Sequence, residues 1–556
     1  AKQFCNANMA ALVTGADPSA RGFAETKDLR IASLGNVDAG KSTLTSCLCR
    51  GILDDGRGKA RSYILRHQHE QRKGQSSSVT MTLTGYRDDE QVLPSGMEGR
   101  RSQNKDHYDV ASRATHRLQF VDLCGHEKYL KSSIYGLTAM VPDAVMVVVG
   151  ADRGIQRMTR EHVGLACALK IPFFVVLTKI DMAPPEVLTD VQTKLRRLLK
   201  RAGRKAFMIR ESSDVPDAVK CMEVGQTSFA PVAEVSCVAG TNMEPLRKFI
   251  KMLTITKTEL VTQVGTSTES KAASTGESGE IPIMTPLDEV SSSQASEASI
   301  SANSDPLNVL LDESYSPPGV GVVVGGTVRS GVAHVGQKLW VGPTKTGDWF
   351  PVQARSIMRQ CVPSKAVYNG QHGTFALKSL TKIPLRREMF RKGMVMADEV
   401  GVEKARKHTV YEFEAEIKVL HHSTTIDKGY SPFIHLAGSR QSARIQSILS
   451  DTGEEVLART GSQVSVRFRF LHYPEYVEID RPMVFREGSA KGCGQITAIF
   501  DEGGRVVASS SKTPSQAKKH AKVLAEAGIK AEKECLNTQV DAAASQIAGL
   551  DVSSDS

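Results

Sequence analysis

Residues 35 to 42 read Gly35-Asn36-Val37-Asp38-Ala39-Gly40-Lys41-Ser42 and match the pattern G-x-x-x-x-G-K-[ST]. An apolar run, Leu29 to Leu34, precedes them and a helix-period segment, Thr43 to Leu53, follows, which predicts a turn between a buried strand and a helix. In such a turn glycines let backbone N–H groups close around phosphate oxygens, the lysine reaches the terminal phosphates, and the serine hydroxyl can ligate Mg²⁺. The sequence therefore predicts a nucleoside triphosphate site made by Asn36, Val37, Asp38, Ala39, Gly40, Lys41, Ser42 and Thr43.

Short apolar runs alternate with helix-period segments on both sides of this motif, between residues 29 and 256. Such alternation is typical of a mostly parallel sheet with helices on both faces, so we expect an α/β P-loop domain. The polar stretch 86–115 lacks this periodicity, and we expect it to be a surface insertion.

A second polar string, Asp122-Leu123-Cys124-Gly125-His126, ends one of these apolar runs. In P-loop enzymes an acid at a strand end holds Mg²⁺, usually through water, and the glycine offers its N–H to the γ-phosphate. Any surface turn can carry D-x-x-G, so this string is informative only together with the first one.

A third string, Thr178-Lys179-Ile180-Asp181, again follows an apolar run directly. A carboxylate can accept hydrogen bonds from N1–H and the 2-amino group of guanine, whereas adenine presents an acceptor at N1 and lacks that amine. Asp181 is therefore expected to select guanine while the stem of Lys179 lies along the base. Backbone N–H groups of Ser236-Cys237-Val238, after the next run, can reach the guanine O6.

The remainder of the chain divides by composition. Serine, threonine, glycine and acids dominate residues 262–316, where nine carboxylates stand against one lysine, so this segment should be largely disordered. Beyond it the pattern has period two: Phe413, Ala415, Ile417 and Val419 alternate with charged residues, which predicts β-strands and two small barrels. In the tail, 516–533 could form a surface helix, with disorder as the alternative. The expected parts are an N-terminal extension 1–28, a G domain 29–256, an acidic linker 257–316, barrels 317–405 and 408–500, and a tail 501–556.

The composition is that of a globular protein, with 556 residues of which 40% are hydrophobic and 24% charged. The net charge of +10 favours a polyanionic partner such as RNA. No apolar run approaches the roughly 20 residues that cross a bilayer, so we expect no membrane span. The ten cysteines include no C-x-x-C pair and suggest reduced thiols of a cytosolic protein. The chain starts at Ala1 without methionine, so upstream sequence can be missing.

Together the motifs resemble those of the translational GTPases, the family of elongation factor Tu and eukaryotic elongation factor one alpha. Residues 122–126 match the third motif D-x-x-G-H, 178–181 are a threonine variant of N-K-x-D, and Ser236 matches the fifth motif. Five runs are further similar to the GTP-binding protein one and two branch: Leu53 to Arg61, Arg66 to Glu70, Gly125 to Lys131, Phe413 to His422 and Val484 to Gly488.

The resemblance implies a GTP-binding G domain followed by two β-barrels that change orientation with the bound nucleotide. It implies that His126 orients the attacking water when RNA of the large ribosomal subunit docks, which makes the ribosome an activator and tRNA an expected ligand. The motifs supply no base and no arginine finger in cis, so we expect slow hydrolysis by the free enzyme.

The resemblance also implies Mg²⁺ ligands on three segments, Ser42, Asp122 and a hydroxyl of the first switch. Where the family usually has G-x-Thr this chain reads Gly74-Gln75-Ser76, so Ser76 is the expected ligand, with Ser77 and Ser78 as alternatives. Ser76 lacks the threonine methyl that restricts χ1, which makes the ordered state of this segment less favoured.

We expect a cytoplasmic, monomeric, Mg²⁺-dependent GTPase with GTP and Mg²⁺ as ligands, of either the elongation or the ribosome-rescue and RNA-surveillance type. The alternative is a nucleotide-gated RNA-binding or adaptor protein with negligible GTP hydrolysis. Two pairs remain open: His421 and His422 fit a packed pair or a loop near tRNA better than a metal site, and Arg467 and Arg469 fit an RNA face or a solvated strand face.

Overall fold

The structure is a computed structural model that describes residues 28–65, 67–94, 103–223, 228–266, 305–421, 424–450, 452–487 and 490–511. The chain forms two compact units, Ala1–Arg406 with His435–Ser439 and Lys407–Ile434 with Arg440–Ser556. No helix within the described ranges is long and apolar enough to span a membrane.

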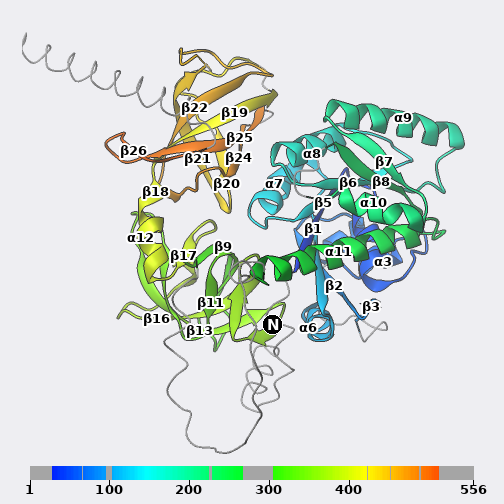
Figure 1. Ribbon diagram of the computed structural model, residues 1–556, viewed down its shortest axis with the longest axis horizontal. Coiled ribbons are helices and arrows are strands. Elements are labelled where there is room, and N and C mark those ends of the chain that lie inside the picture. The colour runs from blue at the N-terminus through cyan, green and yellow to red at the C-terminus, as the bar shows by residue number, and fades with distance from the viewer. Residues whose placement is uncertain are drawn as a thin grey trace, which may run out of the picture. The chain divides into compact units, whose positions relative to one another are not determined.

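An eight-stranded sheet forms the N-terminal part of the first unit, in the order β3-β2-β4-β1-β5-β6-β8-β7 (Figure 1). Its parallel strands are β1 (Leu29–Gly35), β4 (His116–Asp122), β5 (Ala144–Gly150), β6 (Phe173–Thr178), β7 (Lys205–Ile209) and β8 (Phe229–Glu234). Strands β2 (Thr80–Arg87) and β3 (Glu90–Val92) extend it in antiparallel pairing. All residues of β1 and β5 are buried, as expected for strands covered on both faces. The predicted α/β P-loop domain is confirmed.

Helices pack onto this sheet through apolar stripes. Leu44 and Leu48 of the helix after β1, with Leu246 and Phe249 of the helix after β8, are buried in one cluster with β-strand residues. Removing such side chains from water is what holds a helix to a sheet. The helices are α3 (Lys41–Arg50), α4 (Lys59–Ser62), α5 (Gln68–Lys73), α6 (Gln103–Arg113), α7 (Leu130–Thr138), α8 (Arg157–Ala168), α9 (Pro185–Arg201), α10 (Val215–Lys220) and α11 (Met243–Thr266), with 3-10 turns η1 (Glu127–Tyr129) and η2 (Ser212–Asp214).

The segment 86–115 differs from the expected surface insertion. Its helix α6 packs against β2, and Val110, Ala111 and Ala114 join Leu83 and Val362 in a small buried cluster. The spacing of these three residues is helical, but three apolar positions among many polar ones are too few to produce a recognisable hydrophobic periodicity. The segment expected to be a surface insertion therefore contains a helix that is partly buried against β2.

Six antiparallel strands close the first barrel, because β12 pairs with both β17 and β13. A core of buried valines, leucines and methionines fills it. The strands are β9 (Asn308–Tyr315), β10 (Val323–Ser330), β12 (Lys338–Gly342), β13 (Phe350–Arg359), β16 (His372–Ser379) and β17 (Val395–Ala397); short strands β11 (Val332–His334), β14 (Val362–Ser364) and β15 (Ala366–Tyr368), a 3-10 turn η3 (Arg387–Met389) and helix α12 (Glu399–Lys407) complete the module.

The expected linker 257–316 is too long at both ends. Helix α11 continues to Thr266, and β9 is a barrel strand whose Val309, Leu310 and Leu311 are buried. Acidic residues lie near this run of three apolar residues, so the average composition of the segment 262–316 does not reveal a strand there. The prediction of disorder for 267–304 falls outside the described residues.

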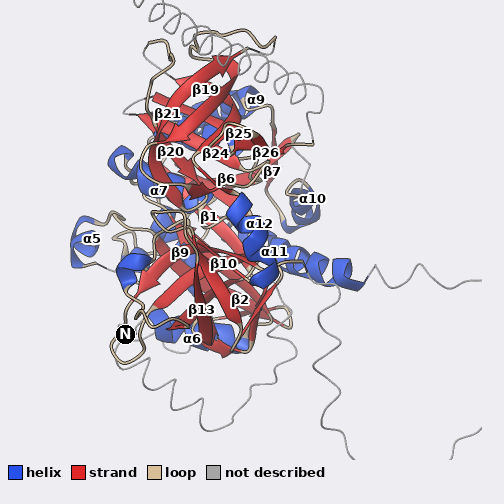
Figure 2. Ribbon diagram, turned by 90° about the vertical axis from the view of Figure 1, so that its left-hand side faces the viewer, coloured by secondary structure: helices blue, strands red, loops and turns tan. Residues whose placement is uncertain are grey.

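A second six-stranded barrel follows, closed by pairing of β19 with both β22 and β25. As predicted, Phe413, Ala415, Ile417 and Val419 of β19 are buried. The strands are β19 (Glu412–His421), β20 (Phe433–Leu436), β21 (Ser439–Leu449), β22 (Gln463–Phe470), β24 (Pro482–Glu487) and β25 (Ala490–Phe500), with β18 (Thr409–Val410), β23 (Glu475–Tyr476) and β26 (Val506–Ser509) beside them. Both barrels are built almost entirely of strands (Figure 2), which confirms the predicted fold class. Strand β26 lies in the expected tail, whereas the candidate helix 516–533 and the extension 1–27 lie outside the described residues.

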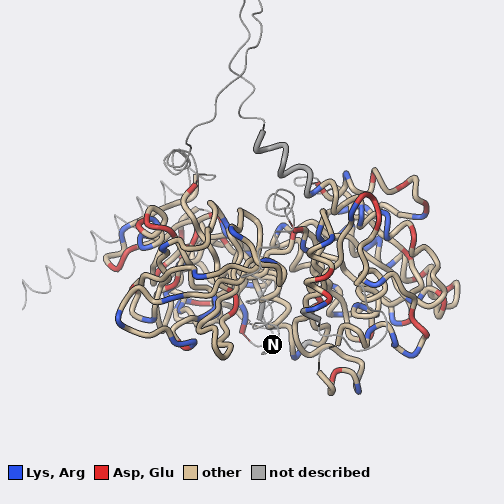
Figure 3. Tube along the Cα trace, turned by 90° about the horizontal axis from the view of Figure 1, so that it is seen from below, with Lys and Arg blue, Asp and Glu red and all other residues tan. Residues whose placement is uncertain are grey.

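Lys and Arg positions are interspersed with Asp and Glu along the chain (Figure 3). On the solvated face of β22, Glu412 holds both arginines of the open pair, with 2.6 Å to Arg467 Nη2 and 2.6 Å to Arg469 Nη1. These arginines are thus bound within their own barrel.

The other pair left open by the sequence cannot be placed in the same way. His422 and the side chain of His421 lie outside what the structure describes.

Candidate nucleotide-binding site

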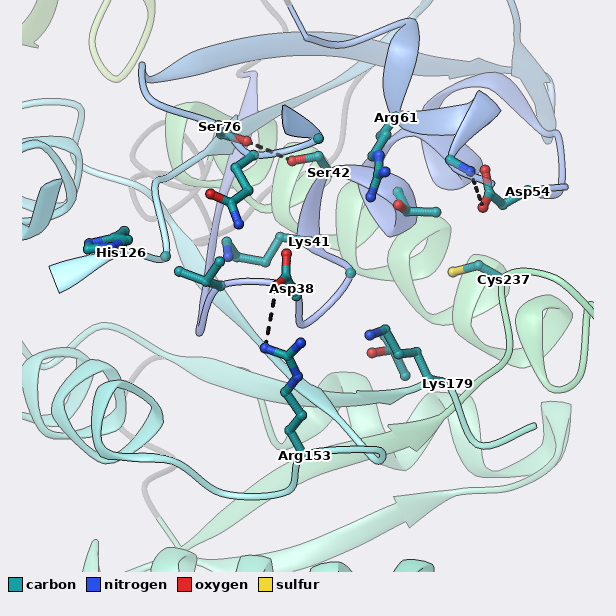
Figure 4. Close-up of a pocket in the computed structure, with 18 of the residues that line it drawn as sticks. Asp38, Lys41, Ser42, Asp54, Arg61, Ser76, His126, Arg153, Lys179 and Cys237 are labelled. Atoms are coloured by element: carbon teal, nitrogen blue, oxygen red, sulfur yellow. Dashed lines mark hydrogen bonds and ion pairs between the residues drawn. The ribbon is translucent and has the colours of Figure 1, made fainter. Parts of the chain in front are cut away.

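A pocket of about 640 Å³ lies beside the loops that follow β1, β4, β6 and β8 (Figure 4). Parallel strands end at the same edge of a sheet, so loops far apart in the sequence meet here. The volume suits a ligand of nucleotide size. The lining includes these predicted site residues: Val37, Asp38, Gly40, Lys41, Ser42, Thr43, Ser76, Gly125, His126, Thr178, Lys179, Asp181, Cys237 and Val238.

Four predicted site residues lie behind the lining, and each holds a lining residue by a hydrogen bond. The Asn36 carbonyl accepts from Lys41 Nζ, and the Ala39 carbonyl accepts from Thr178 Oγ1. Asp122 accepts from Ser42 Oγ, and Ser236 Oγ accepts from the Val238 N–H. They shape the pocket from outside its surface.

The turn between β1 and α3 has the backbone of a phosphate-binding loop. Gly40 caps α3 with φ of 85°, a left-handed conformation that favours glycine. Lys41 Nζ donates to the carbonyls of Gly35 at 3.2 Å and Asn36 at 2.8 Å, which holds the lysine across the loop. Burial lowers the pKa of Lys41. The first residues of α3 therefore present N–H groups and an ammonium to the pocket.

Three oxygen-bearing side chains from three segments converge at the start of α3. Ser42 Oγ lies 2.6 Å from Asp122 Oδ2, and Ser76 Oγ lies 2.9 Å from Ser42 Oγ and 3.3 Å from the same carboxylate oxygen. Asp122 also accepts from Ser33 Oγ at 2.7 Å. Hydroxyl and carboxylate oxygens are the hard ligands that Mg²⁺ prefers, and a P-loop serine with a strand-end aspartate is its usual holder in such enzymes. The donor set fits Mg²⁺ and brings Ser76, rather than Ser77 or Ser78, to this position.

Glu70 of α5 holds the two remaining serines of the first switch. Its Oε1 accepts from the N–H and hydroxyl of Ser77, both at 2.7 Å, and from the N–H and hydroxyl of Ser78, both at 3.0 Å. Burial raises the pKa of Glu70, but these hydrogen bonds outweigh it and lower the pKa to about 2. Motif reasoning did not single out Glu70, since nothing in its spacing points to a carboxylate that binds serines.

Gly125 passes so close to the phosphate-binding loop that only glycine fits. A Cβ there would lie 2.4 Å from Lys41 Nζ and 2.7 Å from the Gly35 carbonyl oxygen. The next residue, His126, is exposed at the rim, and its Nδ1 accepts from the Lys128 N–H at 3.1 Å. That bond places the proton of a neutral ring on Nε2.

At the opposite end of the pocket Lys179 and Asp181 stand where the third string is predicted to bind a base. Lys179 pairs with Asp152 at 2.9 Å and has φ of 60°. Thr178 explains how threonine can replace the usual asparagine, because its hydroxyl donates to the Ala39 carbonyl at 2.7 Å and fastens this loop to the phosphate-binding loop. The Ser236 hydroxyl accepts from the N–H of Ala239 at 2.9 Å and folds the adjoining turn.

Several lining residues lie outside the predicted motifs. Asp54, Arg57 and Arg61 come from the turn before and at α4, and Arg153 comes from the loop after β5, where it pairs with Asp38 at 3.4 Å. The run 53–61 is part of the resemblance to one branch, and this was the signal that could have placed it at the pocket.

Residues 27–258 match the family described as the elongation factor Tu GTP binding domain. GTP-binding protein 2 of Homo sapiens is 35% identical over 476 residues, which cover 85% of this chain and 69% of that protein. The chain belongs to the translational GTPases. GTP-binding protein 1 of Xenopus laevis is 36% identical over 495 residues, or 88% of this chain and 66% of that protein, so the chain spans just under two thirds of this relative's length. Elongation factor 1-alpha of Thermococcus gammatolerans is 25% identical over 457 residues, 80% of this chain and 87% of that protein.

Solved structures share the fold of this translational GTPase. The GTPase-like domain of S. cerevisiae Ski7, bound to GTP, aligns with a TM-score of 0.57 at 13% identity and covers 85% of this chain and 98% of its own. Elongation factor SelB from Methanococcus maripaludis, in complex with a GTP analogue, aligns with a TM-score of 0.53 at 15% identity, covering 86% and 81%. Members of the family bind and hydrolyse GTP.

Proposed function

We propose that the chain is a Mg²⁺-dependent GTPase that works in the cytoplasm as a monomer on ribosomes, with binding of tRNA or the ribosome gated by the nucleotide. The observation that carries the proposal is the convergence of Ser42, Asp122 and Ser76 beside a phosphate-binding loop, in the same pocket as Asp181. One nucleotide can then contact a phosphate site, a Mg²⁺ site and a base site at once.

In this proposal each end of the pocket has its own task. Lys41 and the N–H groups at the start of α3 bind the β- and γ-phosphates, while Ser42, Ser76 and Asp122 hold Mg²⁺, which neutralises charge on those phosphates. Asp181 accepts from the guanine edge, and Lys179 and the turn Ser236-Cys237-Val238 enclose the base. His126 lies at the γ-phosphate end, exposed, where an external RNA can orient it toward the attacking water.

The base assignment is tested with Asp181→Asn. An asparagine amide can donate to the 2-carbonyl of xanthine but cannot accept both guanine donors, so GTP affinity should fall about 5- to 150-fold while xanthosine triphosphate binding improves. Asp190→Asn on α9 is the matched control, because this carboxylate is exposed and its ion pair within the described residues is with the neighbouring Lys194. Unchanged preference for GTP in calorimetry would refute the base assignment.

The catalytic assignment is tested with His126→Ala. GTP binding should persist because His126 is exposed at the rim of the pocket, whereas ribosome-stimulated phosphate release should be abolished. His334→Ala, an exposed histidine of β11, is the control. If ribosome-stimulated phosphate release survives in His126→Ala, His126 does not orient the attacking water.

A second candidate is a nucleotide-gated adaptor with negligible hydrolysis. It is favoured by the exposure of His126 and by the fold likeness to the GTPase-like domain of Ski7, solved with GTP bound. Steady-state phosphate release with and without ribosomes separates the two candidates, because the adaptor releases no more than background in both. Binding of charged against uncharged tRNA to the GTP form then separates an elongation role from ribosome rescue or RNA surveillance.

A further inference from the structure

The turn that carries Arg61 is fastened to the nucleotide pocket from both sides. The Asp54 carboxylate accepts from the N–H of Gly58 at 3.2 Å and of Ala60 at 2.8 Å, which closes the turn before α4. The N–H of Asp54 donates to the Cys237 carbonyl at 2.9 Å, so the turn is anchored to the loop predicted to hold guanine. This anchoring places the start of α4 over the pocket.

The Arg61 side chain runs between two glycines toward the pocket. A Cβ on Gly58 would lie 2.5 Å from Arg61 Nε, and a Cβ on Gly74 would lie 2.6 Å from an Arg61 Nη atom. Both glycines have positive φ, 91° and 66°. The guanidinium thus lies in a channel that a side chain larger than glycine at position 58 or 74 would block. Figure 4 shows it directed into the pocket on the side of Ser42.

Arg61 has no carboxylate partner among the ion pairs of the described residues, whereas two other cations of the lining do have one. Arg153 pairs with Asp38 and Lys179 with Asp152. A half-buried guanidinium with five N–H donors, held over a phosphate site, is suited to bind phosphate oxygens.

We infer that Arg61 is a catalytic arginine supplied in cis, which contacts the phosphates of bound GTP from the face opposite Lys41. The inference rests on the proposed function and deepens it. In hydrolysis the water oxygen forms a bond to the γ-phosphorus, the bond to the β–γ bridging oxygen breaks, and GDP leaves with that electron pair while the water proton passes to inorganic phosphate. Negative charge grows on the leaving oxygens, and a guanidinium there stabilises it. This inference differs from the expectation, drawn from the motifs, that no arginine acts in cis.

The test compares Arg61→Ala and Arg61→Lys with Lys59→Ala in the full chain. Lys59 is exposed in the same turn and does not line the pocket, so its variant matches the loss of charge without loss of the contact. Arginine fingers contribute about 10³-fold or more to turnover. Ribosome-stimulated single-turnover hydrolysis should therefore fall about 10³-fold in Arg61→Ala. The fold-loss in GDP affinity should be at least ten times smaller than the fold-loss in rate. Arg61→Lys, which lacks the bidentate fork, should recover only part of the rate.

A second measurement needs no ribosome. A P-loop protein with an arginine in place can bind GDP with aluminium fluoride, which mimics the phosphoryl group in transfer. Wild type and Lys59→Ala should form this complex, and Arg61→Ala should not, while all three bind fluorescent GDP and so are folded. Equal complex formation by Arg61→Ala and Lys59→Ala overturns the inference. A wild type that forms the complex yet shows no ribosome-stimulated turnover overturns the proposed function and leaves the arginine assignment standing.

Discussion

Replacing Asp28 should destabilise the first unit more than any surface substitution. Asp28 immediately precedes β1, and its carboxylate binds Arg117 of β4 at 2.8 Å and Arg359 of β13 at 2.7 Å. The three side chains have exposures of 0–1%. The G domain and the first barrel thus share a buried ion triad, beside the small cluster that includes Val362.

The magnitude follows from the geometry. At an effective dielectric constant of about 20, unit charges about 4 Å apart attract by about 4 kcal/mol. Asp28 makes two such pairs, but the two guanidinium groups repel each other and all three charges have lost water. Removing one partner of a buried pair costs about 3–5 kcal/mol because a charge stays behind unpaired. We expect Asp28→Asn, which keeps the shape, to lower the free energy of unfolding by about 3–5 kcal/mol.

Urea unfolding at pH 7, followed by circular dichroism, measures this loss in the first unit. The control replaces all three charges together, as Asp28→Leu with Arg117→Met and Arg359→Leu, and should cost much less because no charge is left alone. A stability of Asp28→Asn within 1 kcal/mol of wild type would refute the reasoning.

The ion triad also predicts how the stability of the first unit changes with pH. Burial raises the pKa of Asp28, but Arg359 and Arg117 outweigh it and hold that pKa well below its ordinary value of 3.8. A depressed pKa contributes stability that is present above the unfolded value and is lost as pH falls toward the folded one. The difference between wild type and Asp28→Asn should therefore be constant above pH 5 and shrink below about pH 4.

Three further outcomes are expected. Glu70→Gln loses charge-assisted hydrogen bonds worth about 1–3 kcal/mol, so amide hydrogen exchange at Ser77 should rise about 5- to 150-fold, and unchanged exchange would contradict the role of Glu70. Thr178→Ala removes the bond to the Ala39 carbonyl, worth about 1 kcal/mol, and should weaken GDP and GTP binding about fivefold alike; a loss for GTP alone would be inconsistent with it. Glu412→Gln should lower the unfolding free energy of the second barrel by about 1–3 kcal/mol, measured by urea unfolding, because a carboxylate only 15% exposed then no longer pairs with Arg467 and Arg469, and an unchanged stability would contradict this.

Where chemistry demands a residue type at a fixed spacing, the sequence points to residues that the fold brings to one edge of the sheet. Lys41 and Asp181 follow buried strands and Asp122 ends one, and parallel strands bring these ends together. Its failures are of another kind. Arg61 reaches the pocket through a channel between Gly58 and Gly74, a relation that depends on backbone folding and leaves no pattern.

The errors in the boundaries have the same physical origin. Strand β9 and helix α6 each bury only three or so apolar residues within polar surroundings, and a window average follows the majority. Burial is decided by a partner surface, here the barrel core and the cluster with Val362, which the local sequence does not contain. Long periodic strands such as β19 need no such partner to be recognised.

The two departures from the family motifs each place a hydroxyl at a hydrogen-bonding position. Thr178 replaces asparagine and supplies a hydroxyl that donates to the Ala39 carbonyl. Ser76 replaces threonine and keeps the oxygen beside Ser42, but it loses the methyl that would restrict its rotamer. Neighbouring residues supply a restraint instead, because Glu70 accepts hydrogen bonds from the backbone N–H groups and the hydroxyls of Ser77 and Ser78. A switch segment ordered by a carboxylate can therefore tolerate serine at the metal position, and it makes Glu70 the residue on which the order of that segment depends.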